Sequence, residues 1–419
     1  MKIKLIVITF ASLAIIILPA CTIGSPTSSS TTLSTNISTT TTTSPAATVS
    51  SSTTNSLTTE TTSSSTPANI RTTTVIVSST TTVTTTPTTE ITTQTSTTTI
   101  ASSTGVPPII GVTFRDANLE KVIRNSLGKP AGDITQSDLT TLTSLTVQDI
   151  NVADLTGLQY CTRLTSLDLW STNQIIDITP LASLTGLTRL NLSVNQISNL
   201  SPLASLTNLN ILSLTNNQVS DISPLASLTN LKELDLTSNK ISNVSPLASL
   251  TNLNVLFLNN NKISDISALA SLTRLKTLYL MSNKVSDVSF LASLTNLTSL
   301  FIQNNLLSDV SSLVFLTKLE ELNLAMNQIS DISIVASFTG LKYLWFEHNL
   351  VSDISALAPL INLKEIDIGA NNISDLSPLV QNSGLGEGDR VTTYHNPLND
   401  ISLDTYIPQL KARGVTVMV

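Results

Sequence analysis

The sequence has few of the residues on which most metal and catalytic sites depend. Its 419 residues include two Cys and two His, and charged residues make up 12%. So few sulfur and imidazole ligands argue against a zinc cluster, and the two Cys argue against a disulfide-stapled scaffold. The formal net charge of −7 argues against nucleic acid as a partner, because phosphates attract basic surfaces. Neither a metal nor another cofactor is expected.

Residues 1–21 have the composition of an export signal. Two Lys among the first four residues precede an apolar run of residues 5–18, and small residues then lead to Cys21. This order is typical of secretory signals, and the run is short for a membrane span. Residues 18–21, Leu-Pro-Ala-Cys, resemble the lipobox of bacterial lipoproteins, which implies that Cys21 is lipidated and anchors the protein to the cell membrane. The alternative is ordinary secretion, in which Cys21 has no role.

Residues 22–106 are of low complexity. Of these 85 residues, 55 are Ser or Thr and three are charged. Such a segment cannot bury enough apolar area to offset the entropy lost on ordering. We therefore expect a disordered or extended stalk, open to O-glycosylation, that holds the remainder away from a surface. The alternative is a linker whose length has no function.

From Leu142 onward the sequence repeats with a period of 22 residues. Leu142 begins a degenerate copy and Leu164 a copy with one extra residue. The other first-Leu positions are Leu187, Leu209, Leu231, Leu253, Leu275, Leu297, Leu319, Leu341 and Leu363, which makes eleven copies with a partial twelfth around residues 391–398. The pattern L-x-x-L-x-L-x-x-N-x-[IV]-S-D-[IV]-S resembles the leucine-rich repeat, and the 22-residue form with S-P-L-A-S-L resembles the internalin subclass of bacterial surface proteins. The resemblance implies an α/β solenoid, a curved right-handed coil with a parallel sheet on its concave face.

Each repeat begins with a short strand pattern. In residues 231–237 the alternation predicts that Leu234 and Leu236 point inward while Glu233 and Asp235 point outward. An Asn follows each strand, and its amide can satisfy backbone groups of the turn. We predict that this column is a structural ladder and not a polar binding stripe. Its members are Asn195, Asn217, Asn239, Asn261, Asn283, Asn305, Asn327, Asn349 and Asn371.

A helical turn is expected in the second half of each repeat. In Ser245-Pro246 the Ser fits an N-cap and the Pro the first helical position, which predicts a one-turn helix on the convex side. A row of Asp precedes these turns, and local capping explains it better than calcium binding. The row comprises Asp221, Asp265, Asp287, Asp309, Asp331, Asp353 and Asp375.

Both ends of a repeat array need caps, because each coil buries its Leu row only against neighbours. We expect an N-terminal helical cap at residues 107–141, leucine-rich repeats at 142–382 and a C-terminal α/β cap at 383–419. In the first cap, Thr135 and Asp138 have the spacing of a capping box. In the second, residues 408–413 fit a short helix and residues 415–419 a final strand.

The outward positions of the strands gather aromatic and acidic residues. They hold seven of the fifteen aromatics and seven carboxylates against two Arg. Aromatics massed on an exposed face indicate binding, although stacked rings that merely stabilise the sheet are the alternative. We expect Phe257, Tyr279 and Phe301 to stack across neighbouring strands. Trp345 occupies the same column two repeats after Phe301. The predicted ligand-binding residues are Trp170, Phe257, Tyr279, Phe301, Tyr343, Trp345, Tyr394, Asp235, Glu347 and Asp367.

The sequence gives little support for an enzyme. His348 and His395 fall at turn positions, and Cys161 fits a small buried hydrophobic residue. We expect a monomeric surface protein that is anchored by a lipid at Cys21. By resemblance to internalin-like adhesion proteins, we expect it to bind a protein partner through the concave face. The alternatives are binding of envelope glycans on Tyr343 and Trp345, a passive surface-layer or spacer role, and regulation of an enzyme as in phosphatase-binding subunits of the 22-residue class.

Overall fold

The computed structural model describes residues 53–58, 76–81, 111–148, 150–170 and 174–419, and the chain divides into two units at residue 101. In the first unit, β1 (Thr53–Thr58) pairs antiparallel with β2 (Ile76–Thr81). Both strands fall within the predicted stalk. The predicted signal with Cys21, and the rest of the predicted stalk, lie outside the described residues.

The second unit contains one parallel sheet of thirteen strands whose order follows the chain. Every strand has three residues, and its middle residue pairs with the middle residue of the next strand, as Leu234 does with Leu256. This confirms the predicted solenoid with one strand per repeat. The strands are β3 (Ser144–Thr146), β4 (Ser166–Asp168), β5 (Arg189–Asn191), β6 (Ile211–Ser213), β7 (Glu233–Asp235), β8 (Val255–Phe257), β9 (Thr277–Tyr279), β10 (Ser299–Phe301), β11 (Glu321–Asn323), β12 (Tyr343–Trp345), β13 (Glu365–Asp367), β14 (Arg390–Thr392) and β15 (Thr416–Met418).

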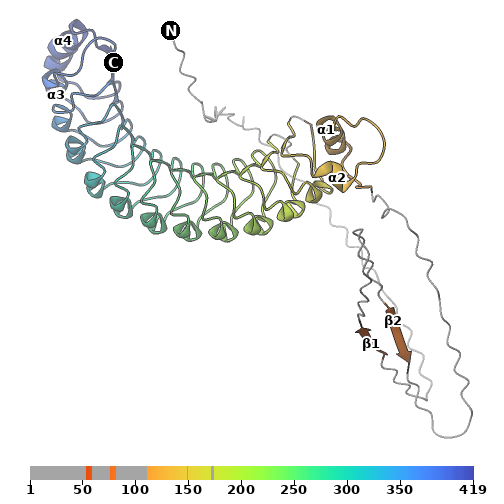
Figure 1. The fold of residues 1–419 in the computed structure, drawn as a ribbon. Coiled ribbons are helices and arrows are strands. Elements are labelled where there is room, and N and C mark those ends of the chain that lie inside the picture. Colours follow the sequence, from red (N-terminus) through yellow and green to blue (C-terminus); the bar gives the residue numbers. More distant parts are fainter. Residues whose placement is uncertain (1–52, 59–75, 82–110, 149, 171–173) are drawn as a thin grey trace, which may run out of the picture. The chain divides into compact units, whose positions relative to one another are not determined.

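A short helical turn follows each repeat strand, and Figure 1 shows these turns along the outer side of the curved solenoid. The sheet therefore forms the concave side. The 3₁₀ turns are η1 (Leu158–Tyr160), η2 (Thr179–Ser183), η3 (Ser201–Ser205), η4 (Ser223–Ser227), η5 (Ser245–Ser249), η6 (Ser267–Ser271), η7 (Ser289–Ser293), η8 (Ser311–Phe315), η9 (Ser333–Ser337) and η10 (Ser355–Leu357), and α3 (Ser377–Gln381) follows them.

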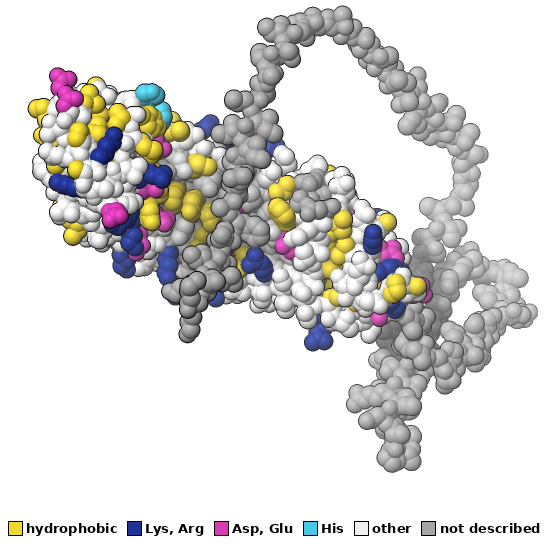
Figure 2. All heavy atoms as spheres, turned by 90° about the horizontal axis from the view of Figure 1, so that it is seen from above, with side chains coloured by type: hydrophobic (Ala, Val, Ile, Leu, Met, Phe, Trp, Pro, Cys, Tyr) yellow, Lys and Arg dark blue, Asp and Glu magenta, His cyan; other side chains and the backbone are white. Residues whose placement is uncertain are grey.

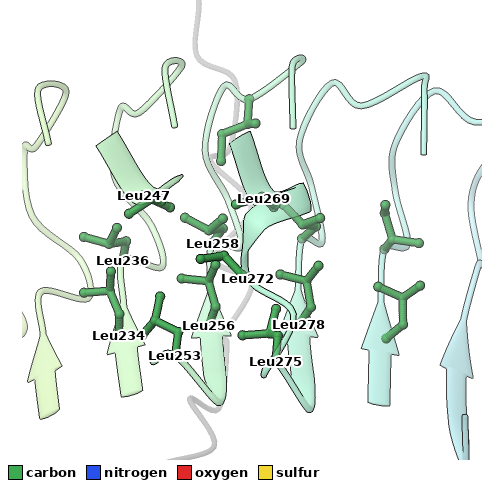
Figure 3. Close-up of a cluster of buried hydrophobic side chains, with 14 of the residues drawn as sticks. Leu234, Leu236, Leu247, Leu253, Leu256, Leu258, Leu269, Leu272, Leu275 and Leu278 are labelled. Carbon is green, nitrogen blue, oxygen red and sulfur yellow. The ribbon is translucent and has the colours of Figure 1, made fainter. Parts of the chain in front are cut away.

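Leucine side chains fill the space between the strands and the helical turns. Leu234, Leu256 and Leu278 have no exposed surface, and Figure 3 shows them pointing from successive strands toward leucines of the turns, such as Leu247 and Leu269. Burying one such side chain stabilises the fold by roughly 1.5–3 kcal/mol. Since every coil packs only on its neighbours, this row also fixes the register of the outward side chains.

The Asn column is the predicted structural ladder. The Asn305 amide donates to the carbonyls of Leu280, Ile302 and Gln303 at 3.0, 3.0 and 3.2 Å, and its Oδ1 accepts from the Val285 amide at 3.0 Å. The same four contacts recur along the column, for example at residues 217 and 349. One side chain therefore joins its own turn to the preceding repeat.

The predicted N-cap role of the Ser in each Ser-Pro pair is wrong. Helix η5 begins at Ser245 itself, its cap residue is Val244, and Pro246 is the second helical residue. The Ser245 amide donates to Asn243 Oδ1 at 2.9 Å. The side chain two residues earlier therefore closes the turn, which leaves the Ser free to be the first helical residue.

The Asp row has this same capping role. Asp265 Oδ1 accepts from the Ser267 amide at 2.8 Å, and this hydrogen bond lowers the pKa of Asp265. Equivalent bonds form throughout the row, which confirms the capping interpretation. Among residues 111–419, apart from the undescribed positions, there is no group of three or more His, Cys, Asp or Glu placed to hold a metal.

Helical caps cover both ends of the repeats. At the N-terminal end, α1 (Ala117–Leu127) buries Leu119 and Ile123, and α2 (Gln136–Leu139) begins with the predicted capping box of Thr135 and Asp138. Hydrogen bonds from Lys129 and Thr135 lower the Asp138 pKa to about 2. At the C-terminal end, a π-helical turn η11 (Ser402–Tyr406) and α4 (Ile407–Ala412) precede β15. No helix in the described part of the chain is both long and apolar enough to cross a membrane.

Candidate functional site

Three aromatic rings stack across neighbouring strands on the concave face. Phe257, Tyr279 and Phe301 pair in register at the ends of β8, β9 and β10. The first two ring centroids are 4.9 Å apart, and the last two are 4.4 Å apart with planes 1° from parallel. The Tyr279–Phe301 pair confirms the predicted stacking, whereas the planes of Phe257 and Tyr279 are tilted by 31°. All three rings are half-buried, so one side of the stack remains exposed.

Trp345 continues this stack although it stands two repeats further on. Its ring reaches past the intervening Asn323 to lie 5.9 Å from Phe301, and it also stacks on Tyr343 at 5.9 Å and 8°. Its indole Nε1 donates to Glu365 Oε1 at 3.2 Å, which fixes the ring plane. We call Phe257, Tyr279, Phe301, Trp345 and Tyr343 the aromatic ladder.

Half-buried carboxylates lie beside the Trp345 end of the ladder. Burial raises the pKa of Glu347, and the neighbouring Asp367 adds to the rise. Burial likewise raises the Asp367 pKa, and its Oδ1 accepts from the Gly369 amide at 3.0 Å. Glu347 Oε2 is covered and has no hydrogen-bond partner within the described part of the chain. The described residues therefore leave one oxygen of this carboxylate pair without a hydrogen-bond donor.

Tyr394 closes the far side of this acidic area. Its ring lies directly over Gly369, where an added Cβ would overlap ring atoms Cε1 and Cζ. The ring meets His348 edge-on at 6.3 Å, and burial followed by the Asp367 charge raises the Tyr394 phenol pKa. A glycine at this outward position is what lets the ring lie against the sheet.

The remaining predicted binding residues lie apart from this end. Asp235 pairs in register with Phe257, at the other end of the ladder, and its Oδ1 accepts from the Thr237 amide at 2.9 Å. Trp170 follows β4, four strands before β8, which is about 19 Å along the sheet at ~4.8 Å per strand. The structure thus joins the aromatic residues from Phe257 to Trp345 and leaves Trp170 as a separate position.

The candidate nucleophile and bases have the predicted structural settings. Cys161 is buried, and burial raises its thiol pKa to about 12. A thiol in this state is a poor nucleophile. His348 and His395 are exposed at left-handed turn positions, with φ of 56° and 54°.

Comparison with known proteins agrees with this geometry. The family model for leucine-rich repeats in pairs of copies matches residues 185–227, 229–271, 251–293, 273–314, 295–338, 317–359 and 339–381. An internalin, InlF from Listeria monocytogenes, is 34% identical with a TM-score of 0.64, over 75% of this chain and 98% of that one. This chain belongs to the internalin-type leucine-rich repeat proteins. A search of curated protein sequences gave no match.

Two more distant structures share the fold of this internalin-type chain. The functional domain of InlJ from Listeria monocytogenes is 22% identical with a TM-score of 0.59, over 71% of this chain and 66% of that one. The leucine-rich repeat ectodomain of the receptor kinase GASSHO1/SCHENGEN3 from Arabidopsis thaliana, solved in complex with Casparian strip integrity factor 2, is 24% identical with a TM-score of 0.53. It matches over 62% of this chain and 34% of that one.

Two contributors to the concave face of this internalin-type solenoid do not follow from the repeat pattern. Glu365 is one of the seven outward carboxylates and also orients the Trp345 indole, and Gly369 makes room for the Tyr394 ring. A glycine in an outward column one repeat before a tyrosine in the same column is a signal that could have been recognised.

Proposed function

We propose that this protein binds a protein partner non-covalently through the concave face of its solenoid. The observation that carries the proposal is the aromatic ladder, five rings in continuous contact that remain half-exposed on one sheet face. Tyrosine and tryptophan side chains supply a large share of the energy at protein interfaces. Solenoids of this kind use their concave surface for extended contacts.

Sheet stabilisation alone accounts poorly for the ladder. The interior leucines already fix strand register, and repeats that carry Ser213 or Asn191 at the same outward position pair their strands equally well. Ring pairs contribute about 0.5–1.5 kcal/mol beyond burial, so the ladder adds stability in addition to offering a surface. Exposed ring faces, however, are not needed for that gain.

The relatives favour binding over catalysis. The chain shares its family with InlF, and the more distant plant ectodomain is solved in complex with a factor. On this basis the concave face acts as a recognition surface. Its seven carboxylates against two Arg favour a partner with basic groups, and association would slow as salt rises.

Display at a cell surface is the setting that the N-terminal sequence favours. In this proposal Cys21 carries the lipid, and residues 22–106 hold the solenoid away from the membrane. Metabolic labelling with a fatty-acid analogue tests this directly. The wild-type protein should incorporate the label and Cys21→Ala should not; equal labelling of the two would rule out the anchor at this residue.

The binding proposal is tested with two matched variants of the full chain. Phe257→Ala/Tyr279→Ala/Phe301→Ala removes the start of the ladder, whereas Phe290→Ala/Phe315→Ala removes two aromatics that are 38% and 60% exposed on the helical turns η7 and η8. Each variant is used as bait for proteins from the organism's surroundings. The concave variant should lose the captured partner and the convex variant should keep it.

The same pair of variants separates the competing roles. Retention of the partner by a folded concave variant would contradict the proposal. Signals on a glycan array that disappear in the concave variant would instead favour binding of envelope glycans. An unchanged surface phenotype after removal of the ladder would favour a passive spacer.

A further inference from the structure

We infer that the C-terminal end of the concave face is a subsite for an arginine side chain of the partner. The inference rests on the proposed function and specifies which chemistry the partner brings. The subsite lies between the Trp345–Tyr343 ring pair and Tyr394, with Glu347 and Asp367 between them. Figure 2 shows hydrophobic and acidic side chains near the end of the solenoid that carries the histidines.

Three adjacent strands form a small grid of outward positions here. Trp345 pairs in register with Asp367, and Asp367 with Thr392. In the column two residues further along each strand, Glu347, Gly369 and Tyr394 follow one another. Because Gly369 has no side chain, the Tyr394 ring lies directly over it, and the phenol ring fills the centre of the grid beside the Glu347 carboxylate.

The ring pair provides a flat surface for a planar cation. Tyr343 and Trp345 lie nearly parallel, and the hydrogen bond from the indole to Glu365 holds the plane in place. A guanidinium group stacks on such a surface, while its edge remains free to donate hydrogen bonds. A lysine ammonium gains the cation–π attraction but not the stacked planar contact.

The carboxylates lack the donors that a guanidinium supplies. Glu347 Oε2 has no partner, and Asp367 receives only the Gly369 amide among the hydrogen bonds of the described residues. A guanidinium carries five N–H donors in a fork that matches carboxylate oxygens. Because Glu347 Oε2 is covered, Glu347 must change rotamer to meet a donor that arrives from outside.

The two lysines of the neighbouring strands are paired with other carboxylates. Lys342 is paired with Glu320 at 2.6 Å, and Lys364 with Asp389 at 3.2 Å. Arg390 lies in register beside Glu365, at the edge of the grid, and is exposed. None of the ion pairs in the described part of the chain includes Glu347 or Asp367.

A peptide titration monitored at the tryptophan side chains tests the subsite. The chain contains two Trp, so the full-length ¹⁵N-labelled protein gives two indole signals, which Trp170→Phe assigns. Acetyl-Gly-Arg-Gly-amide is compared with the same peptide carrying citrulline, which has the shape of arginine without its charge. The Arg peptide should shift the Trp345 signal saturably and leave Trp170 unmoved, and the citrulline peptide should shift neither.

Two carboxylate variants sharpen the test. Glu347→Gln should weaken binding of the Arg peptide about tenfold, as loss of a charge-assisted hydrogen bond implies. Glu387→Gln, which removes an exposed carboxylate outside the concave columns, should bind as the wild type does. An immobile Trp345 signal, an equal response to citrulline, or unchanged affinity in a folded Glu347→Gln variant would each overturn the subsite.

This outcome is separable from that of the proposed function. The peptide titration needs no natural partner and is read at Trp345, whereas partner capture is read with the Phe257, Tyr279 and Phe301 variant. Loss of capture in that variant together with a silent Trp345 would defeat the arginine subsite and leave concave-face binding intact. If the Trp345 signal shifts with the Arg peptide but the Phe257, Tyr279 and Phe301 variant still captures the partner, the arginine subsite would stand and the proposed concave-face binding would fail.

Discussion

A single asparagine side chain closes the turn after the strand in most repeats, and its removal should be costly. In Asn305→Ala the carbonyls of Leu280, Ile302 and Gln303 lose a donor, and the Val285 amide loses its acceptor. A buried polar group left without a partner costs about 1–3 kcal/mol. We expect the free energy of unfolding in urea to fall by about 2–4 kcal/mol for this variant.

The adjacent Asn304 is the matched control. It is exposed and has a left-handed φ of 55°, so Asn304→Gly keeps the backbone unstrained. Its stability should lie within about 0.5 kcal/mol of the wild type, as for other surface changes. Equal losses for the two variants would show that the Asn column does not hold the coils together.

Glu347 should reduce stability at neutral pH, since its pKa is raised by burial in the folded protein. The folded state then binds its proton more readily than the unfolded state, so stability falls as pH rises through the interval between the ordinary and the raised pKa. Glu347→Gln should therefore melt at a higher temperature than the wild type at pH 7. The difference should shrink as pH falls below the ordinary Glu value of 4.5.

The exposed Glu387 provides the comparison for this pH effect. Glu387→Gln should leave the melting temperature nearly unchanged across the same pH range. The titratable groups that interact with Glu347 are Asp367 and Tyr394, and both remain in the variant. A Glu347→Gln protein that melts lower than the wild type at pH 7 would mean that this carboxylate is stabilised by a partner in the folded state.

At this scale the sequence predicted the repeated positions and missed the single ones. The inward leucines and the Asn column follow from a 22-residue period, because the same contact recurs in each copy. The contact from Trp345 to Glu365 and that from Gly369 to Tyr394 occur once each. They depend on which way individual side chains turn between repeats, and a repeat pattern contains no information about that.

Among the short elements, α2 is the one whose start depends most clearly on a local signal. The Thr135 hydroxyl accepts from the Asp138 amide at 3.1 Å, and the Asp138 carboxylate accepts from the Thr135 amide at 2.7 Å. Replacing such a cap by Ala costs about 1 kcal/mol. Thr135→Ala should lower the unfolding free energy by that amount, whereas Ser137→Ala, exposed within the same helix, should not.

The helical turns of the repeats illustrate where element-level prediction fails. Their existence and their place on the convex side follow from the Ser-Pro pairs, but their first residue does not. The Asp or Asn two positions before the Ser takes the Ser amide, as Asn243 does for Ser245, and the boundary moves by one residue. Two residue types that can both cap compete within three positions, and spacing alone does not decide between them.

For the solenoid as a whole, the period was enough to predict the fold and the side on which the aromatics lie. The continuity of the ladder was not predictable, because Trp345 and Phe301 are two repeats apart and meet only through the length and direction of the indole. The sequence likewise does not show that Glu347 Oε2 is the carboxylate oxygen without a donor. The residue types of the proposed binding surface thus follow from the sequence, and their arrangement follows from the structure.

The most direct test of the concave-face account is hydroxyl-radical footprinting of the full chain, free and with its captured partner. The account predicts protection of Phe257, Tyr279, Phe301 and Trp345, with Phe290 and Phe315 on the convex turns oxidised equally in both states. Protection confined to Phe290 and Phe315, with the aromatic ladder as reactive as in the free protein, would contradict it.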